Sequence, residues 1–447
     1  MPTEPAEAYA ALRSADRDGG LPPERREALL DRLRRMVTDR RRDLVAALQA
    51  DFGRRAAEEI LVAEVLTVVR AAQYARRHLR RWAKPRRVGV PWPFLPARAW
   101  IVPQPLGVVG IVSPWNYPVH LSLVPVVDAL AAGNRVALKP SELTPRTANA
   151  LEVLLRDALG DEVARTVLGG PETAAEFVRQ PFDHLMFTGS TARGREVLQA
   201  SAENLTPVTL ELGGKCPAIL LPDADLDRAV AAILRGKGLN AGQTCIAADL
   251  LLTVGHDRTR VVDALRRAHG RLFPVGLPTD LHPARQYGLS DVVGDTRLEP
   301  LGVEPCVSLA TDLTSDSPLL REEIFGPVLP LIELSDAAAA SSWVRSRPAP
   351  LALYLFTRST AAVSGFLAAT RSGAVVVNET VVHAAMTPLP FGGLGASGFG
   401  RYHGEAGFRR FSNERLLVRG ARRSLAAMLA PPYRPRSSRL IDRLFRM

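Results

Sequence analysis

A cysteine and a glutamate give the first indication of chemistry in this 447-residue chain. Cys245 ends the segment Gly-Gln-Thr-Cys, and Glu211 lies 34 positions upstream in Glu-Leu-Gly-Gly-Lys. A thiolate can attack a carbonyl carbon, and a carboxylate can then activate water against the resulting thioester. Alternatively, Cys245 is a buried structural residue, the usual fate of a free cysteine. We favour the catalytic role because other segments fit the same chemistry.

The segment Ser-Pro-Trp-Asn-Tyr-Pro (residues 113–118) supplies a candidate oxyanion donor. Its two prolines restrict the backbone on both sides, so the amide of Asn116 would be held rigidly. A fixed amide N–H can donate to the negative charge that forms when a thiolate adds to an aldehyde. The alternative is a structural turn, and the rigid framing favours the catalytic role.

Two segments have the composition expected around a nucleotide. In Phe-Thr-Gly-Ser-Thr-Ala-Arg-Gly (residues 187–194), the backbone at Gly189 and Ser190 would open a helix and face a pyrophosphate. The spacing is GxxxxG rather than GxGxxG, and a tight strand–helix turn explains it equally well. Lys139 and Glu142 could bind the ribose of an adenosine, or could form a solvated strand end.

A third segment, Glu-Glu-Ile-Phe-Gly-Pro-Val, occupies residues 322–328. Glu323 could bind the second ribose of a dinucleotide, with Phe325 against a nicotinamide ring. The alternative is that the acidic pair belongs to the surface.

Composition excludes several other classes of protein. Hydrophobic content of 47% and charged content of 23% are typical of a soluble globular chain. Three cysteines form no CxxC motif, and the eight histidines form no HExxH motif. We therefore expect a reducing, cytoplasmic compartment and no metal site. We expect neither a signal peptide nor a membrane span, since residues 106–132 are interrupted by three prolines.

The net charge of +11 is concentrated in two windows. Residues 65–100 contain nine Lys and Arg and no acidic residue, and residues 415–447 contain nine Arg and one Asp. These windows contain few aromatic residues that could stack on bases, so we expect solvated surface and no nucleic-acid partner.

Hydrophobic periodicity predicts an α/β fold. Amphipathic helices are expected over residues 24–50 and 56–82. Short apolar runs then alternate with helical stretches, which predicts a doubly wound parallel sheet with ligands at the carboxyl ends of its strands. A second alternating set after residue 213 predicts a second α/β domain. The segment 271–320 is rich in turns and has no clear assignment.

Taken in order, six segments resemble the motifs of the aldehyde dehydrogenase superfamily over roughly residues 20–433. They are Pro-Trp-Asn-Tyr-Pro, Lys-Pro-Ser-Glu, Phe-Thr-Gly-Ser-Thr, Leu-Glu-Leu-Gly-Gly-Lys, Gly-Gln-Thr-Cys and Glu-Glu-Ile-Phe-Gly-Pro-Val. Leu-Pro-Phe-Gly-Gly-Leu-Gly-Ala-Ser-Gly (residues 389–398), Tyr-His-Gly (402–404) and Pro-Pro-Tyr (431–433) resemble the class 3 branch. Within that branch, the chain is most similar to the bacterial coniferyl aldehyde dehydrogenases.

The resemblance implies a cofactor domain, a catalytic domain and a bridging element that forms a homodimer. The matched domains are a nicotinamide-cofactor domain (1–83 and 102–210), a bridging element (84–101 and 412–430), a catalytic domain (211–411) and a basic tail (431–447).

By position, the resemblance makes Cys245 the nucleophile, Glu211 the general base and Asn116 an oxyanion donor. Tyr117 becomes a substrate-wall residue. The residues matched to NAD binding, with NADP also possible, are Trp115, Lys139, Glu142, Gly189, Ser190, Glu323 and Phe325. The implied cycle forms a thiohemiacetal, transfers a hydride to NAD(P)+, and hydrolyses the thioester to an acid. The thiol then needs no His partner if helix dipoles or the cofactor's charge lower its pKa.

Two features depart from the family. The span from Cys245 to Glu323 is shorter than usual, which affects the substrate entrance more than the chemistry. The tail carries Leu440, Ile441, Leu444 and Phe445 among arginines, the composition of a short interfacial helix. We therefore consider weak peripheral membrane contact, with a disordered or self-packed tail as the alternative.

The expected substrate is an aromatic aldehyde, such as coniferyl aldehyde, or a medium-chain aliphatic one. A CoA-acylating dehydrogenase is the nearest alternative, although a CoA-resolved thioester needs no water-activating Glu211. A catalytically inactive nucleotide-binding scaffold is the alternative from another class.

Overall fold

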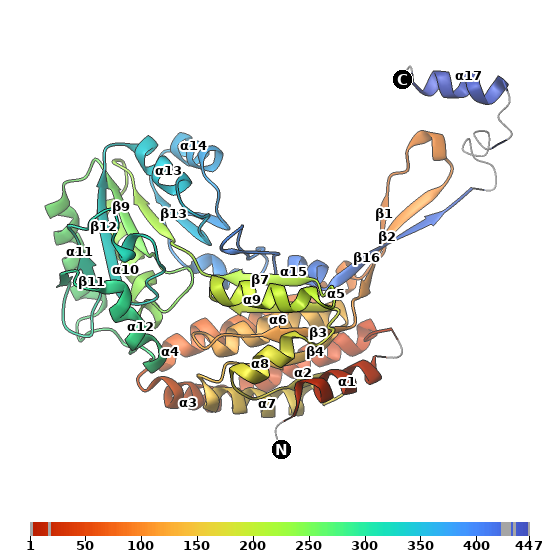
Figure 1. The fold of residues 1–447 in the computed structure, drawn as a ribbon, viewed down its shortest axis with the longest axis horizontal. Helices are drawn as coiled ribbons and strands as arrows, with labels where there is room; N and C mark the ends of the chain where they lie inside the picture. Colours follow the sequence, from red (N-terminus) through yellow and green to blue (C-terminus); the bar gives the residue numbers. More distant parts are fainter. Residues whose placement is uncertain (1–2, 17–18, 422–430, 432–434, 446–447) are drawn as a thin grey trace.

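The computed structural model describes residues 3–16, 19–421, 431 and 435–445. Three sheets organise these residues: one of six strands, one of seven and one of three. The first two form the body of the molecule, and the third extends from it as an arm (Figure 1). The predicted α/β class, with two domains built on mainly parallel sheets, is confirmed.

The six-stranded sheet has the order β15-β7-β6-β3-β4-β5, and all neighbours are parallel except β15. Its strands are β3 (Val108–Val112), β4 (Arg135–Lys139), β5 (Ala164–Thr166), β6 (His184–Gly189), β7 (Val208–Leu212) and β15 (Gly398–Phe399). The crossover helices are α6 (Pro118–Ala132), α7 (Pro145–Leu159), α8 (Pro171–Val178) and α9 (Thr191–Ala202). Every residue of α6 is buried, because other elements cover the helix on all sides.

Three of the N-terminal helices pack against α6 or α7, whereas the first helix of the chain packs against α8 and strands β3, β4 and β5. The N-terminal elements are α1 (Pro5–Ala15), α2 (Pro23–Asp39), α3 (Arg41–Phe52), α4 (Ala57–Ile60), a π-helical turn (Leu61–Val65) and α5 (Leu66–Trp82). The single helix expected over 24–50 is thus two helices, which are separated at Arg40.

The seven-stranded sheet has the order β10-β11-β12-β9-β8-β13-β14, and only the β10–β11 pair is antiparallel. Its strands are β8 (Pro217–Leu220), β9 (Leu250–Val254), β10 (Leu298–Pro300), β11 (Ser308–Ala310), β12 (Val328–Leu334), β13 (Ala352–Phe356) and β14 (Ala374–Val377). The other elements of this lobe are α10 (Leu226–Gly238), α11 (Arg258–Leu272), α12 (Pro283–Val293), α13 (Ala337–Arg345) and α14 (Thr360–Ala369), with 3-10 turns at Leu239–Gly242, Pro318–Leu320 and Val382–Ala385. The segment 271–320 therefore contains a helix and two strands.

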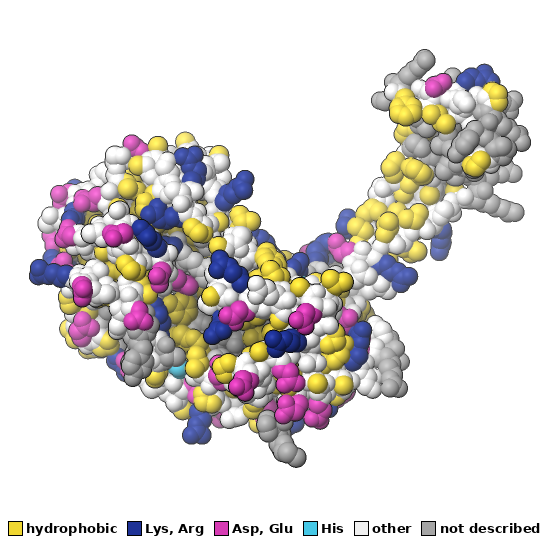
Figure 2. Space-filling view, in the orientation of Figure 1, with side chains coloured by type: hydrophobic (Ala, Val, Ile, Leu, Met, Phe, Trp, Pro, Cys, Tyr) yellow, Lys and Arg dark blue, Asp and Glu magenta, His cyan; other side chains and the backbone are white. Residues whose placement is uncertain are grey.

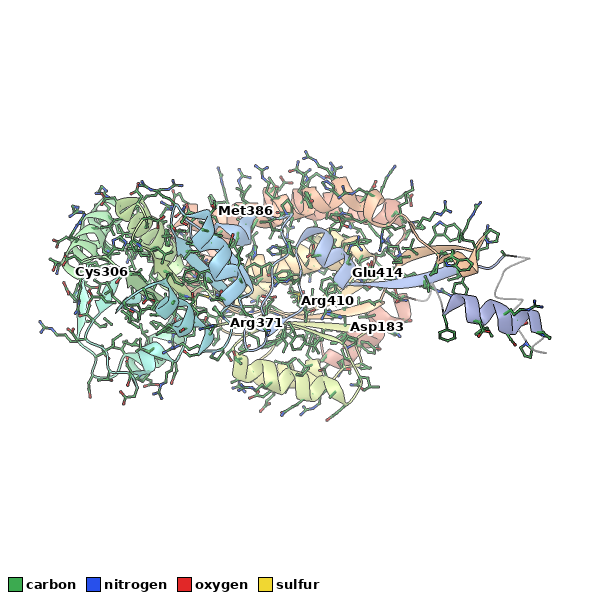
Figure 3. All side chains as sticks on the ribbon, turned by 90° about the horizontal axis from the view of Figure 1, so that it is seen from above. Asp183, Cys306, Arg371, Met386, Arg410 and Glu414 are labelled. Carbon is green, nitrogen blue, oxygen red and sulfur yellow. The ribbon has the colours of Figure 1, made fainter. Side chains whose placement is uncertain are left out.

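The arm consists of β1 (Arg86–Val88), β2 (Arg98–Pro105) and β16 (Ser412–Arg419), all antiparallel, with a 3-10 turn (Trp92–Phe94) at its tip. Hydrophobic side chains cover much of its visible surface, and helix α17 (Pro435–Leu444) lies beyond its end (Figures 1 and 2). Glu414 marks the base of the arm, and Cys306 lies at the opposite end of the molecule (Figure 3).

The chain returns to the first sheet after the second lobe is complete. Strand β15 pairs with β7, and α15 (Gly404–Arg410) packs on α6. Arg410, labelled in Figure 3, donates to Thr209 Oγ1 at 2.7 Å and to the Val208 carbonyl at 2.8 Å. Residues 398–410 therefore belong structurally with the six-stranded sheet, whereas the sequence analysis placed them in the catalytic domain (211–411). The boundary at 210 and 211 also falls inside β7, and β2 continues to residue 105.

Candidate active site

Cys245 lies on a loop that starts where α10 ends. Asn240, Ala241 and Gly242 all have positive φ, so the backbone turns sharply there. A Cβ on Gly242 would collide with the carbonyl of Gly326, so only glycine lets these two segments approach each other. The partly exposed Cys245 side chain then lines a cavity of about 290 Å³.

Glu211 lines the same cavity from the carboxyl end of β7. The residue is 3% exposed, and neither carboxyl oxygen has a hydrogen-bond partner among the described residues. Burial raises its pKa well above the usual value, and Arg401 only partly counteracts this effect. The carboxyl group is therefore poised to take a proton in a site that shields it from bulk water.

The thiol of Cys245 does not have the lowered pKa that the sequence analysis considered. Burial raises it well above its usual value, and the nearby Glu323, Cys216 and Glu211 add to the effect. The protein's own groups thus favour the neutral thiol. Cys216 is buried, and its Sγ lies 3.5 Å from the carbonyl oxygen of Cys245.

Asn116 is held against the nucleophile loop and lines the cavity. Its Nδ2 donates to the backbone carbonyl of Gln243 at 3.1 Å, and its backbone carbonyl accepts from Asn240 Nδ2 at 3.0 Å. A primary amide has two N–H donors, so one remains for a ligand. The structure thereby brings the three predicted catalytic side chains into one cavity.

Tyr117 occupies a different place from the one predicted. It does not line this cavity; instead, its hydroxyl lies 2.8 Å from Thr244 Oγ1, and its ring faces the guanidinium of Arg55. Tyr117 is only 7% exposed, so its contact is with the residue before Cys245 rather than with open space.

Five of the residues matched to cofactor binding line the cavity: Trp115, Gly189, Ser190, Glu323 and Phe325. Ser190 caps α9 by accepting from the Arg193 N–H, so the free N–H groups of the first turn begin beside the cavity. The rings of Trp115 and Phe325 meet edge to face at 5.6 Å.

Lys139 and Glu142 do not line this cavity. Lys139 is the last residue of β4 and Glu142 follows the strand; Lys139 Nζ donates to the Pro140 carbonyl at 2.8 Å and lies 3.4 Å from Glu142 Oε2. Since β4 is parallel to β3, both residues lie at the sheet edge that also carries Asn116.

A cluster of ion pairs around Asp249 was not predicted from the sequence. Asp249 is paired with Lys215 Nζ at 2.6 Å and with Lys237 Nζ at 3.6 Å. Its carboxylate also accepts from the Ile324 N–H at 3.2 Å, so it holds the loop before β12 that presents Glu323. Only Lys215 lies in a segment quoted above, Glu-Leu-Gly-Gly-Lys, and the pairing was not predicted because the three members are separated along the chain.

Comparison with known proteins adds a second kind of observation. The profile of the aldehyde dehydrogenase family matches residues 4–288 and 284–417. The chain belongs to the aldehyde dehydrogenase family.

Relatives and solved structures agree with this assignment. A probable coniferyl aldehyde dehydrogenase of Pseudomonas aeruginosa is 39% identical over 431 residues, which cover 93% of this chain and 90% of the relative. Aldehyde dehydrogenase family 3 member A2 of Rattus norvegicus is 36% identical, covering 94% of this chain and 90% of the relative. A substrate-bound structure of Staphylococcus aureus AldH has a TM-score of 0.92 and 30% identity, covering 98% of this chain and 99% of that one.

As an aldehyde dehydrogenase, the protein is an oxidoreductase that uses a nicotinamide cofactor to oxidise aldehydes. The cavity fits such a cofactor. The Oε1 atom of Glu323 is buried with no hydrogen-bond partner among the described residues, and it can accept from a ribose hydroxyl. A side chain on Gly213 would collide with this carboxyl group, so the site depends on the absence of a Cβ there.

Three charged or aromatic residues that line the cavity of this aldehyde dehydrogenase were not predicted to have a role. Phe391 and Tyr402 line it beside Glu211, and the Tyr402 hydroxyl is buried without a partner among the described residues. Both lie in segments quoted for the family resemblance, so that resemblance was the available signal. Arg285 also lines the cavity, from α12 in the unassigned segment, and no motif indicated it.

Proposed function

We propose that this aldehyde dehydrogenase oxidises aromatic aldehydes with NAD+ through a covalent Cys245 intermediate. One observation carries the proposal: a single cavity is lined by Cys245, Glu211 and Asn116 together with the start of α9 and Glu323. A nucleophile, a base, an oxyanion donor and a dinucleotide site are thus within reach of one bound aldehyde.

The first half of the proposed reaction depends on Cys245 and Asn116. The thiol gives its proton to the Glu211 carboxylate, which releases it to solvent before the second half-reaction. The sulfur attacks the aldehyde carbon, and the free N–H of Asn116 donates to the oxygen that becomes negative. The backbone N–H of Cys245 is the proposed second donor. The bound cofactor supplies a hydride acceptor and a positive charge, which favours the thiolate that the protein alone disfavours.

The second half depends on Glu211. Its carboxylate removes a proton from water, which attacks the thioester and releases the acid. The burial of this carboxyl group beside Cys245 supports hydrolysis over transfer to CoA, because CoA brings its own thiol and needs no activated water.

The proposed cofactor-binding residues lie partly inside the cavity and partly beside it, at the carboxyl end of β4. Glu323 would bind the ribose next to the nicotinamide, with Trp115 and Phe325 packing on the ring. Lys139 and Glu142 would bind the adenosine ribose, outside the cavity itself. The carboxylate of Glu142 favours a ribose hydroxyl over a 2′-phosphate, so we propose NAD+ rather than NADP+ as the preferred cofactor.

An aromatic substrate is supported by the wall next to Glu211. Phe391 and Tyr402 meet edge to face at 5.8 Å, and Leu121 completes an apolar surface for a planar ring. Relatives named coniferyl aldehyde dehydrogenase, such as the one from Pseudomonas sp. that is 38% identical, support the same class. Tyr117 would act on the substrate only through Thr244.

We further propose a homodimer joined by the arm, where Leu416 and Val418 are 62% and 54% exposed. The domain division proposed from sequence is retained, with residues 211–212 and 398–410 moved to the cofactor domain.

A cytoplasmic location is supported by the three free cysteines. None of the described helices has the length and apolar character needed to cross a membrane. We also propose weak membrane contact through the basic tail. The exposed side chain of Phe445, which directly follows α17, supports this contact. Much of that tail lies outside the described residues.

A panel of aldehydes and cofactors tests these proposals. Wild type and Cys245→Ala would be assayed with coniferaldehyde, benzaldehyde and hexanal, each with NAD+ and NADP+. We expect reduced cofactor and free acid from wild type with the aromatic aldehydes and NAD+, and no product from the variant. Activity with hexanal alone would overturn the aromatic assignment, and product formed only with added CoA would overturn hydrolysis.

A further inference from the structure

We propose that Arg285 binds the pyrophosphate of the cofactor and thereby supplies a positive charge that the cavity otherwise lacks. This inference rests on the placement of the cofactor in the cavity proposed above. Arg285 is the third residue of α12, in the segment that the sequence left unassigned.

The charge balance of the cavity is the first argument. Glu211 and Glu323 both line it, whereas Arg285 is the only Lys or Arg among the described residues that do so. A dinucleotide pyrophosphate carries two negative charges, which repel each other and which neither carboxyl group can offset. The N–H groups at the start of α9 offset part of this repulsion, and a guanidinium offsets more.

The hydrogen bonds of Arg285 are the second argument. Its Nη2 donates to the Ile324 carbonyl at 2.5 Å, and its Nε donates to the Phe325 carbonyl at 3.3 Å. These neutral acceptors fix the side chain without neutralising it. Arg285 forms no ion pair with any described residue, and a guanidinium has five N–H donors, so further donors remain for an anion.

The same contacts couple Arg285 to the proposed ribose site. The two carbonyls belong to the residues that directly follow Glu323, so one side chain braces the loop and faces the cavity. Its partial burial strengthens a charge-assisted bond relative to one at the surface. Arginine suits this place because its planar fork can span two acceptors, whereas lysine offers only a point charge.

Binding to the enzyme without cofactor tests the proposal. Calorimetry would measure the dissociation constants of NAD+, ADP-ribose and adenosine for wild type, Arg285→Gln and Arg285→Lys. We expect Arg285→Gln to weaken NAD+ and ADP-ribose by about tenfold or more and adenosine by less than about twofold. Arg285→Lys should fall between the two, because it keeps the charge. Arg193→Gln is the matched control, since it removes an exposed charge from the first turn of α9.

Salt dependence separates a charge contact from a bracing role. The affinity of wild type for ADP-ribose should fall more steeply with added salt than that of Arg285→Gln. Equal slopes, or Arg285→Lys binding as weakly as Arg285→Gln, would overturn the pyrophosphate contact and leave only the bracing role. If wild type binds NAD+ and Arg285→Gln binds it equally well, this inference alone fails. If wild type binds neither NAD+ nor ADP-ribose, the proposed cofactor site fails with it.

Discussion

The cavity and the arm each contain groups without a suitable partner, but the groups differ in polarity and exposure. In the cavity, polar groups are buried without partners, as in Glu211 and the hydroxyl of Tyr402. On the arm, apolar side chains are exposed, with Leu416 at 62% and Trp92 at 46%. A buried polar atom without a hydrogen bond is costly and indicates a missing small ligand or water. An exposed apolar strand indicates a missing protein surface.

The largest effect should come from removing the thiol. We expect Cys245→Ala to lower kcat by at least about 10⁴-fold, because no other described group in the cavity is a comparable nucleophile. NAD+ affinity should stay within about threefold of wild type, since the thiol binds no cofactor in this scheme. Steady-state reduction of NAD+ and calorimetric binding would check both expectations. Turnover retained in the variant would contradict the covalent mechanism.

Glu211→Gln should slow the second half-reaction by about 10²- to 10⁴-fold. A burst of reduced cofactor equal to the enzyme concentration should precede slow turnover, because the thioester still forms, with the thiol proton released directly to solvent, but is not hydrolysed. Rapid-mixing absorbance would measure the burst, and mass spectrometry would detect the acyl group on Cys245. A variant that hydrolyses the thioester at the normal rate would remove Glu211 from the role of base.

The raised pKa values predict the shape of the pH profile. Cys245 and Glu211 each act after losing a proton, and burial raises the pKa of both. The rate should therefore increase as the pH rises through these raised values and should be lost on the acid side. A profile of kcat against pH for wild type and Glu211→Gln would check this, and the limb due to Glu211 should vanish in the variant. A wild-type rate already at its maximum at acid pH would contradict the assignment.

Asn116→Ala should lower kcat by about 10²-fold, the usual effect of removing one oxyanion donor. Its loss also removes one of the two side-chain hydrogen bonds to the Gln243 carbonyl, so thermal unfolding must be compared with wild type. Asn116→Asp is the matched control, because it keeps the size but removes both N–H donors. Activity within about threefold of wild type in both variants would exclude the oxyanion role.

The smallest catalytic effect is expected from the arm. Leu416→Arg with Val418→Arg should convert dimers to monomers, because two charges would be placed on an apolar strand. Activity per subunit should change by about twofold or less, since neither residue lines the cavity. Light scattering after size exclusion would measure the mass, with Leu205→Arg, 87% exposed elsewhere, as control. A dimer that persists in the double variant would contradict the proposal that the apolar residues of the arm form the subunit interface.

Local patterns predicted much of the fold. The apolar runs over residues 135–139 and 250–254 each predict a strand, and the structure has β4 and β9 at these positions. These apolar runs are buried on both faces, so their hydrophobic composition is a reliable local signal. The break at Arg40 and helix α12 were not predicted, because tertiary contacts rather than composition decide them.

The sequence alone determined the family and predicted which residues act as the nucleophile, the base and the oxyanion donor. Those assignments depend on short contiguous motifs, whose chemistry is visible without coordinates. Tertiary structure decided that Tyr117 faces Thr244 and that Arg285 reaches the cavity. It also decided that the pKa of Cys245 is raised. Burial and the meeting of distant segments control these properties, and neither can be read from residues that are neighbours in the chain.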